Sequence, residues 1–458
     1  MITIPLFEAS IAVGGIPNQF ISPMDYILSV TQRSSEVALG ALFVALRGNR
    51  VDGHDFVKEA QQKGAVAAIV EYLVEGVTIP QIIVPSTEVA LGDLARIWRS
   101  KLQLPLVAVT GSVGKTTTKE LIAHVLQKNY HTHKSRKNYN NQLGVPIELL
   151  RLERDHQVSV VELGMRDLNQ INYLAKIARP NFGVITNIGI SHIGILKTRD
   201  NIAKAKAEIF QGMDSGSIAL LNRDDAFYDT LVDLAPCRVI SYGMHPQSDI
   251  CISEITLIDS MFPSFKINGV SITMNHCTGE YNAYNAAIAF AIAECMGVSQ
   301  EDIVSQVASF VQPERRGVSI RLRNGALLLD STYNAAPDSI VANLKTIAQR
   351  KQEKHRLIFV IGDMLELGSY SKEAHEQVGN TVAQLGNKVD LLITIGEYTK
   401  GTSEVSKVGN RHHFEDAQQA TEFIQEHITP YDLILFQGSN QMNLGGIVDD
   451  LEKCFGIA

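Results

Sequence analysis

Apolar residues along this chain fall mainly in short, nearly unbroken runs that alternate with longer amphipathic stretches. The clearest runs lie at 106–110, 158–164, 182–189, 326–330, 357–363, 391–396 and 433–438. Runs of this kind are typical of parallel strands buried on both faces, with helices packed between them. The pattern therefore predicts an α/β protein with mostly parallel, doubly wound sheets.

Three shorter apolar runs come earlier, at 41–46, 65–70 and 81–85. A chain of 458 residues is too long for one ordinary hydrophobic core. We therefore predict three domains. They are a smaller N-terminal α/β domain over 1–85, a central domain with a mostly parallel sheet over 86–312, and a C-terminal Rossmann-like domain over 313–458.

Composition and charge narrow the class of protein. Apolar residues make up 45% of the chain and charged residues 20%, as in soluble globular proteins. The net charge of -8 argues against nucleic-acid binding, which usually needs a basic face. The five cysteines are scattered and form no C-x-x-C pair, which favours a reducing cytoplasm over a disulfide scaffold or zinc site. We expect neither a signal peptide nor a membrane span.

The stretch "TGSVGKTTTKE" (110–120) joins an apolar run to a helical pattern. Its glycines let backbone N–H groups approach phosphates, and the following helix N-terminus favours negative charge. Lys115 would neutralise phosphate oxygens and Thr116 would bind magnesium. Val109 stands where the strict phosphate-loop pattern has its first glycine, so the loop is shorter. The predicted nucleotide-binding residues of the loop are Gly111, Ser112, Val113, Gly114, Lys115, Thr116 and Thr117.

Polar residues also follow the next two predicted strands, where ligands of open α/β sheets bind. Glu162 ends one run, and Asn187 and His192 follow the other. Taken singly, each residue has an ordinary explanation. A glutamate after a strand is as often solvated as functional, a lone histidine is usually a satisfied loop residue, and Lys206 would be an exposed surface lysine.

Several longer stretches gain meaning when they are taken together. "TGSVGKTTTKE", "KNYNNQLGVPIELL", "VVELGM", "ITNIGISHIG" and "AKAKAEIF" resemble, in this order, the central domain of the Mur ligases. "ALFVALRGNRVDGHDF" resembles the N-terminal uridine-nucleotide domain of that family. "TYNAAPDS" and "IGDMLELG" resemble the C-terminal domain of the branch that acts on UDP-N-acetylmuramoyl-tripeptide and D-alanyl-D-alanine. The resemblance covers nearly the whole chain.

The resemblance implies an ATP-dependent amide ligase of peptidoglycan precursor synthesis. In the implied reaction, the γ-phosphate of ATP goes to the terminal carboxylate of the UDP-linked tripeptide, and the amine of D-alanyl-D-alanine attacks the acyl phosphate. Charge develops on phosphoryl and carbonyl oxygens, so the catalyst must be mainly cations and fixed dipoles. The implied cofactors are ATP and two Mg²⁺ ions. The resemblance also implies a cytoplasmic protein, and we expect a monomer.

The resemblance assigns roles to individual residues. Lys115, Glu162, His192 and Lys206 are the implied catalytic residues. The implied metal ligands are Thr116 and Glu162 for the nucleotide magnesium, and His192 and a carbamylated Lys206 for a second ion. Further nucleotide contacts are implied for Asn285, Arg316 and Asp330. Substrate contacts are implied for Arg33, Arg47, Gly48, Asn138, Asn141, Tyr333 and Asn334.

Four positions depart from the family pattern. Tyr281 stands where the family usually has a histidine near the adenine, and it keeps an aromatic surface for stacking. Ser331 replaces the second aspartate of a "DD-[AS]-YNANP" motif. Gln437 and Asn440 replace the two cations of "KGSR", which removes charges that could hold the carboxylate of the incoming dipeptide.

Three other readings compete with this one. A sister ligase of the family would add another amino acid, although the "DNPR" typical of the diaminopimelate-adding branch is absent. A phosphate-loop NTPase that is not a ligase would usually carry a base-reading "NKxD", which is also absent. A binding protein that has lost activity is compatible with the changes at Ser331, Gln437 and Asn440.

Overall fold

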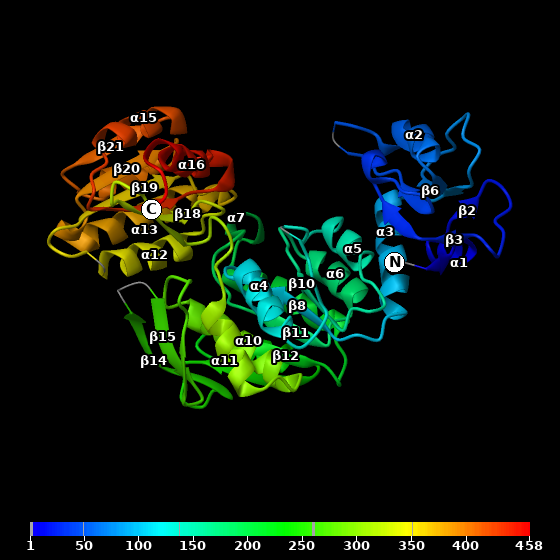
Figure 1. The fold of residues 1–458 in the computed structure, drawn as a ribbon, viewed down its shortest axis with the longest axis horizontal. Helices are drawn as coiled ribbons and strands as arrows, with labels where there is room; N and C mark the ends of the chain where they lie inside the picture. The colour runs from blue at the N-terminus through cyan, green and yellow to red at the C-terminus, as the bar shows by residue number, and fades with distance from the viewer. Residues whose placement is uncertain (1–2, 49, 137, 259–261, 350) are drawn as a thin grey trace.

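The computed structural model describes residues 3–48, 50–136, 138–258, 262–349 and 351–458. Asn49 and Lys137, which belong to stretches quoted above, lie outside the described residues. Within these residues, the strands form three large sheets and one two-stranded pair. Figure 1 shows three bodies, with the N-terminal and C-terminal bodies on opposite sides of the central one. Within the described part of the chain, no helix is long and apolar enough to cross a membrane.

The N-terminal body is built on a five-stranded sheet. Its order is β2 (Ile16–Pro17), β7 (Gln81–Ile83), β6 (Ala65–Val70), β5 (Ala41–Val44) and β4 (Ser29–Thr31). The strands from β4 to β7 are parallel, and β2 pairs antiparallel at the edge. Helix α2 (Val57–Gln62) connects β5 to β6, while α1 (Leu6–Ala12) lies between β1 (Ile4–Pro5) and β3 (Tyr26–Ile27). The three early apolar runs are therefore β5, β6 and β7.

The central body contains a nine-stranded sheet. Its order is β16 (Val270–Thr273), β15 (Phe262–Ile267), β14 (Ile250–Ile258), β13 (Arg238–Gly243), β12 (Ile218–Asn222), β11 (Phe182–Ile185), β8 (Leu106–Thr110), β10 (Val158–Glu162) and β9 (Thr132–Lys134). The pairs from β9 to β14 are parallel, as predicted, and β14 to β16 form an antiparallel extension. The apolar runs did not reveal this extension, because β14 has only two buried residues, both near its start, and its other residues are half-buried or exposed.

The C-terminal body has a six-stranded sheet between two helical layers. Its order is β17 (Val318–Arg321), β18 (Leu327–Ser331), β22 (Asp432–Gln437), β19 (Arg356–Gly362), β20 (Leu391–Ile395) and β21 (Arg411–Phe414). All pairs are parallel except the edge pair of β17 and β18. In Figure 1, one face carries α12 (Pro337–Gln349) and α13 (Ser371–Leu385), and the other carries α15 (Ala417–His427) and α16 (Leu444–Phe455). α14 (Thr399–Val405) packs on α13 and β20.

Helix α3 (Thr87–Ser100) leads from the N-terminal sheet into the central body. Ser86 caps it by accepting a hydrogen bond from the backbone N–H of Val89 at 3.3 Å. The apolar side of α3 packs on α5 (Gly144–Leu149) and α6 (Gln170–Ala178). Trp98 is fully buried there, and its indole N–H donates to the carbonyl of Leu152 at 2.9 Å. This packing ties the helix to the central core.

The register of the central sheet gathers the polar strand ends. β8 lies between β10 and β11, with Glu162 opposite Val109 and Ile185 opposite Thr110. The glycine loop between β8 and α4 (Lys115–Leu126) therefore lies beside the ends of β10 and β11. After β11, His192 immediately precedes α7 (Ile193–Leu196), and Lys206 lies in the next helix, α8 (Arg199–Ala207). The parallel topology thus brings the predicted catalytic residues to one edge of the sheet.

Candidate active site

A cleft of about 990 Å³ lies between the central and C-terminal bodies. The central body contributes the glycine loop, Glu162 and His192 to its lining. The C-terminal body contributes Arg316, Tyr333 and Asn334. The volume is at the upper end of the range of roughly 300–1,000 Å³ found for small-molecule sites. The cleft therefore joins most of the residues predicted to hold a nucleotide.

The glycine loop is held in place by hydrogen bonds to one asparagine. The backbone N–H of Val113 donates to the Asn187 side-chain oxygen at 3.1 Å, and the Asn187 amide donates back to the Val113 carbonyl at 3.0 Å. Gly114 has φ +87° at the start of α4, a conformation that glycine adopts without strain. Lys115 folds over this loop and donates to the carbonyls of Gly111 at 2.9 Å and Ser112 at 3.2 Å. Asn187 had been singled out only as a residue at a strand end, and its role as the brace of the loop comes from the structure.

Glu162 is a fixed carboxylate beside the loop. It is 3% exposed, and its two oxygens accept hydrogen bonds from the Thr116 hydroxyl at 2.6 Å and the Asn140 amide at 2.8 Å. The contact to Glu162 is thus made by Asn140, between the predicted Asn138 and Asn141. Both of these also line the cleft. Asn141 uses its side-chain oxygen to accept from the backbone N–H of Gly144 at 2.8 Å, at the start of α5.

Lys206 is buried, with 1% of its surface exposed, whereas Lys204 on the same helix is exposed. This excludes the ordinary surface-lysine explanation for Lys206. Burial and the charge of Lys115 hold the pKa of Lys206 well below its usual value, against the opposing effect of Glu162. Lys206 does not itself line the cleft, but its electrostatic interactions place it close to residues that do.

His192 has its backbone in the left-handed region, with φ +64°, just before α7. Burial lowers the pKa of its imidazole to about 3, with further lowering from Lys206, Lys115 and Arg166. The pKa of Lys115 is also lowered, first by burial and then by Arg316, while Glu162 raises it. Several basic groups in and beside the cleft therefore repel one another.

The side-chain oxygens of Thr116 and Glu162 fit a magnesium site whose other ligands are waters and nucleotide phosphates. Among the described residues, no group of three or more His, Cys, Asp or Glu side chains is arranged to hold a metal. Thr116 and Glu162 supply two adjacent oxygen ligands, which suits an Mg²⁺ ion that keeps waters and binds nucleotide phosphates. His192 could hold a second ion together with Lys206, provided that the lysine amine is converted into an oxygen ligand.

The remaining predicted nucleotide residues differ in how they are placed. Asn285 lines the cleft and accepts a hydrogen bond from the Thr118 hydroxyl at 2.9 Å. The Arg316 guanidinium stacks on the ring of Tyr333, 3.9 Å from the ring centroid. Asp330 is not part of the cleft lining, and its carboxylate accepts from the hydroxyl of Thr332 at 2.6 Å. The predicted nucleotide contact of Asp330 stays a prediction.

Comparisons with known proteins bear on this arrangement. The family model of the Mur ligase middle domain matches residues 109–293. The Mur ligase glutamate ligase domain matches 315–440, and the Mur ligase family catalytic domain matches 27–99. The UDP-N-acetylmuramoyl-tripeptide–D-alanyl-D-alanine ligase of a Synechocystis strain is 36% identical, over 93% of this chain and 94% of that protein. The chain belongs to the Mur ligase family. The enzyme of the same name from Bacillus subtilis is 30% identical, over 90% of each chain.

Solved structures of Mur ligases share the whole fold. A crystal structure of MurF from Acinetobacter baumannii has a TM-score of 0.89 and 30% sequence identity, and the match covers 99% of both chains. The MurF ligase of Thermotoga maritima, solved in complex with ADP, has a TM-score of 0.81 and 25% identity, over 93% of this chain and 97% of that one. The predicted α/β Mur ligase fold is confirmed.

Two departures from the Mur ligase pattern lie next to each other. Ser331 and Gln437 are partners in the register of β18 and β22. The Asn343 amide donates to the Ser331 hydroxyl at 3.3 Å and to the Gln437 side-chain oxygen at 3.2 Å. The family pattern would place an aspartate opposite a lysine at this pair. This chain replaces both charges together, so neither is left buried without a partner. Asn440 and Tyr281 also line the cleft.

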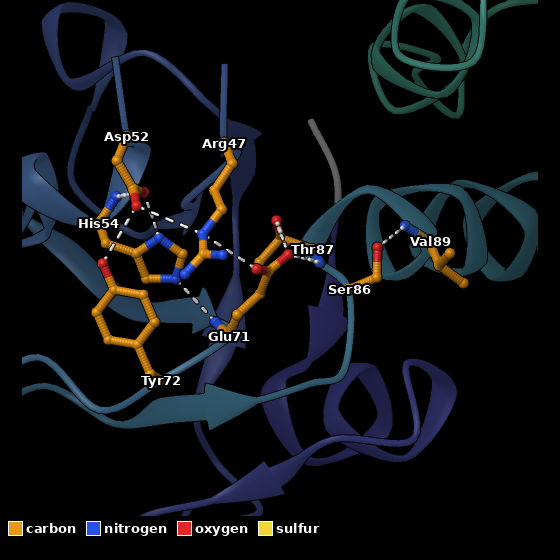
Figure 2. A network of polar contacts seen from close by, with 8 residues as sticks. All are labelled: Arg47, Asp52, His54, Glu71, Tyr72, Ser86, Thr87 and Val89. Atoms are coloured by element: carbon orange, nitrogen blue, oxygen red, sulfur yellow. Dashed lines mark hydrogen bonds and ion pairs between the residues drawn. The ribbon is translucent and has the colours of Figure 1, made fainter. Parts of the chain in front are cut away.

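The predicted substrate residue Arg47 belongs to a polar network in the N-terminal body (Figure 2). Its guanidinium lies 3.4 Å from Asp52 and 3.3 Å from Glu71, and above the ring of Tyr72. His54 is buried and contacts Asp52 through Nδ1 at 2.6 Å. Its Nε2 accepts the backbone N–H of Glu71 at 2.8 Å, which requires the proton of a neutral ring to be on Nδ1.

The same network reaches the start of α3. Glu71 accepts hydrogen bonds from the backbone N–H of Thr87 at 3.1 Å and from its hydroxyl at 3.3 Å (Figure 2). The other predicted substrate residues of this body, Arg33 and Gly48, are exposed, as Arg47 is. Arg33 pairs with Glu36 at 3.1 Å, and the backbone N–H of Gly48 donates to Val51. Arg33, Arg47 and Gly48 are not in the lining of the cleft, so they would contact a different part of a ligand.

Four further charged residues of the cleft were missed by the sequence analysis, namely Arg166, Arg315, Asp338 and Glu366. Arg166 follows β10, and Glu366 lies in the C-terminal stretch "IGDMLELG". Both line the cleft, and their side chains pair at 3.1 Å between the two bodies. The signal available in the sequence was the position of Arg166 four residues after Glu162. Nothing in the sequence indicated that Glu366 would lie across from it.

Proposed function

We propose that this Mur ligase joins D-alanyl-D-alanine to UDP-N-acetylmuramoyl-tripeptide at the cost of one ATP. The observation that carries this function is the cleft itself. It brings the glycine loop, the fixed carboxylate of Glu162 and the imidazole of His192 from one body against Arg316 and Tyr333 from another. Relatives that are named for this reaction match at 30–36% identity over most of the chain.

The reaction needs a carboxylate to become an electrophile. An oxygen of the tripeptide carboxylate attacks the γ-phosphorus of ATP, the bond to the β-phosphate oxygen breaks, and ADP leaves. Lys115, which already reaches the glycine loop carbonyls, swings to the phosphate oxygens and neutralises charge there. Bound magnesium would polarise the same phosphates, held by Thr116 and Glu162.

The amide forms in the second half of the reaction. The neutral amine of D-alanyl-D-alanine attacks the carbonyl carbon of the acyl phosphate, forming the C–N bond. The C–O bond to phosphate breaks, inorganic phosphate leaves, and the amine loses one proton to solvent. Water in the cleft would hydrolyse the same intermediate, and the C-terminal body lies where it can cover the site.

Lys206 is proposed to carry a carbamate. Its neutral amine would add to carbon dioxide, forming an N–C bond and releasing one proton. This chemistry requires an unprotonated amine, and burial beside Lys115 favours that form. The product would be an anionic oxygen ligand beside the cation of Lys115, and it would hold a second magnesium together with His192.

The rest of the chain is proposed to hold the substrates. The N-terminal body would bind the uridine nucleotide with Arg33, Arg47 and Gly48, and the C-terminal body would bind the dipeptide near Asn334. Asn138 and Asn141 would face the carboxylate that is activated. One chain contains all of these residues, so a monomer is sufficient, and we place the reaction in the cytoplasm, where ATP is available.

A phosphate-release assay tests this function. Purified protein is mixed with UDP-N-acetylmuramoyl-tripeptide, ATP, Mg²⁺ and either D-alanyl-D-alanine or a single amino acid. We expect phosphate release with D-alanyl-D-alanine but not with the single amino acid. The product should be heavier than the UDP-linked tripeptide by the mass of D-alanyl-D-alanine minus one water. Turnover with a single amino acid would identify a sister ligase, and release that needs no peptide substrate would identify a simple NTPase.

A further inference from the structure

The C-terminal body meets the central body along a tight seam beside the cleft. We define this seam as the contact of α7 with the loop 365–370, which contains the short helix η4 (Gly368–Tyr370). A Cβ atom added at Gly194 would lie 2.6 Å from the backbone carbonyl of Leu367. The Tyr370 hydroxyl donates to the carbonyl of Lys197 at 3.0 Å. Figure 1 shows α7 between the two bodies, and the seam brings their backbones into direct contact.

One carboxylate crosses this seam into the active site. An oxygen of Glu366 lies 3.1 Å from the guanidinium of Arg166, and the other lies 3.4 Å from Nδ1 of His192. Glu366 has φ +65°, a left-handed conformation that costs a residue with a Cβ roughly 1–2 kcal/mol. Such conformations persist where the surroundings hold them in place, and they cluster at functional sites. Here the backbone strain accompanies a side chain that is aimed at His192.

The ring of His192 needs a partner at this nitrogen. Its Nδ1 is buried, and among the described residues it makes no hydrogen bond within normal geometry. The Glu366 carboxylate is a charged acceptor at slightly longer range. A neutral imidazole has one N–H, and a nearby carboxylate favours placing it on Nδ1. That tautomer leaves the lone pair of Nε2 free for a metal ion.

We propose that Glu366 is a positioning residue that holds His192 in the tautomer required of a metal ligand. Histidine ligands usually donate their other ring N–H to a carboxylate or carbonyl, and loss of that partner weakens metal binding about 10–100-fold. The carboxylate comes from the C-terminal body, so the second metal site is complete only when the two bodies meet. This inference rests on the proposed metal role of His192.

Two measurements without turnover test the proposal. In the first, the metal-free protein is labelled with ¹⁵N-histidine, and the His192 signals are assigned with His192→Gln. We expect the proton on Nδ1 in the wild type and a shift of population toward Nε2 in Glu366→Ala. The control is Tyr370→Phe, which removes another polar contact of the same seam and should leave the tautomer unchanged.

In the second, Mn²⁺ binding is titrated by electron paramagnetic resonance with ADP and bicarbonate present. We expect Glu366→Ala and His192→Gln to weaken the second site about 10–100-fold, and Tyr370→Phe to bind like the wild type. Circular dichroism and thermal unfolding verify that each variant is folded.

The outcomes separate the two hypotheses. If His192→Gln binds two Mn²⁺ ions as the wild type does, the metal role of His192 is wrong. If His192→Gln weakens Mn²⁺ binding at the second site but Glu366→Ala does not, the positioning role is wrong. It is also wrong if the tautomer of His192 is unchanged in Glu366→Ala. If Tyr370→Phe weakens Mn²⁺ binding as much as Glu366→Ala does, the effect belongs to the seam as a whole, and the positioning role of Glu366 is also wrong.

Discussion

The polar network around Arg47 and the cleft balance their charges in opposite ways. In the network, Arg47 lies between the carboxylates of Asp52 and Glu71, and both ring nitrogens of His54 have partners (Figure 2). In the cleft Lys115 is half-buried, beside the cleft Lys206 is buried, and each lowers the pKa of His192. The first region places its cation between two carboxylates, whereas the second places basic groups where each disfavours protonation of the others.

This difference separates a structural role from a catalytic one. A network of mutually paired groups holds its side chains in one arrangement. Basic groups that oppose one another's protonation are unfavourable without a ligand and become favourable when a polyphosphate or another anion binds beside them. The basic groups of the cleft therefore suit anionic reactants, whereas the ion pairs of Arg47 hold its guanidinium in one orientation.

The largest effect is expected from Lys115→Ala, which removes a cation from the cleft. We expect kcat to fall by at least about a hundredfold, the scale of losing one group that stabilises the transition state. Steady-state phosphate release measures it, with the exposed Lys128→Ala as a matched control that should be near wild type. Near-normal turnover of folded Lys115→Ala would remove the glycine loop from the catalytic site.

Lys206→Ala should lose most activity, because the proposed anionic ligand disappears. Acetate or formate should restore part of the rate by filling the vacant anionic position. The matched control is Lys204→Ala, two residues away and exposed, which should be near wild type and insensitive to either acid. A fully active Lys206→Ala, or rescue of Lys204→Ala instead, would contradict the assignment.

These two lysines were predicted from the sequence for different reasons. Lys115 is specified by local chemistry, since a glycine turn after a buried strand predicts a phosphate loop without knowledge of the fold. Lys206 could be chosen over Lys204 only through the family resemblance, and the structure supports the choice because the helix buries one and exposes the other. The apolar periodicity of this alanine-rich helix was too weak to show which of the two lysines is buried.

Residues that act across bodies could not be predicted. Asn187, Asn140 and Glu366 take their roles from partners that are 22 or more residues away in the sequence or on another sheet. The antiparallel extension of the central sheet was missed because its strands are partly exposed and lack unbroken apolar runs. The paired change at Ser331 and Gln437 became interpretable only when the register placed them side by side.

Two histidines, His133 and His192, should make the stability of the protein depend on pH. Burial, followed by His156 and nearby cations, lowers the pKa of His133 to about 3, as burial does for His192. Between pH 6.5 and 3 the unfolded chain binds protons that the folded protein excludes, so stability falls as the pH falls. Each histidine contributes a slope of up to about 1.4 kcal/mol per pH unit.

Thermal and denaturant unfolding across this window should show a smaller slope in His133→Gln and in His192→Gln. Phosphate release at neutral pH should fall only in His192→Gln, because His133 lies on β9 outside the lining of the cleft. An unchanged slope in both variants would contradict the burial argument.

The smallest effect is expected in the network around Arg47. Glu71→Ala removes the carboxylate that caps α3 at Thr87 and leaves Arg47 with Asp52 as its acidic partner in the network. We expect the free energy of unfolding to fall by about 1 kcal/mol, the usual value of a helix cap. Because Glu71 is not in the lining of the cleft, kcat at saturating substrates should change less than about twofold. A loss of kcat comparable to that of Lys115→Ala would end the distinction between the two regions.

The central claim is that the cleft transfers the ATP γ-phosphate to a carboxylate, and isotope transfer tests it most directly. UDP-N-acetylmuramoyl-tripeptide is prepared with ¹⁸O in its terminal carboxylate and turned over with ATP and D-alanyl-D-alanine in ordinary water. Mass spectrometry then measures the phosphate released. We expect one ¹⁸O atom in each phosphate, because the oxygen that forms the acyl phosphate leaves with it. Phosphate without ¹⁸O would show that ATP is hydrolysed by water, and the ligase mechanism proposed for this cleft would be wrong.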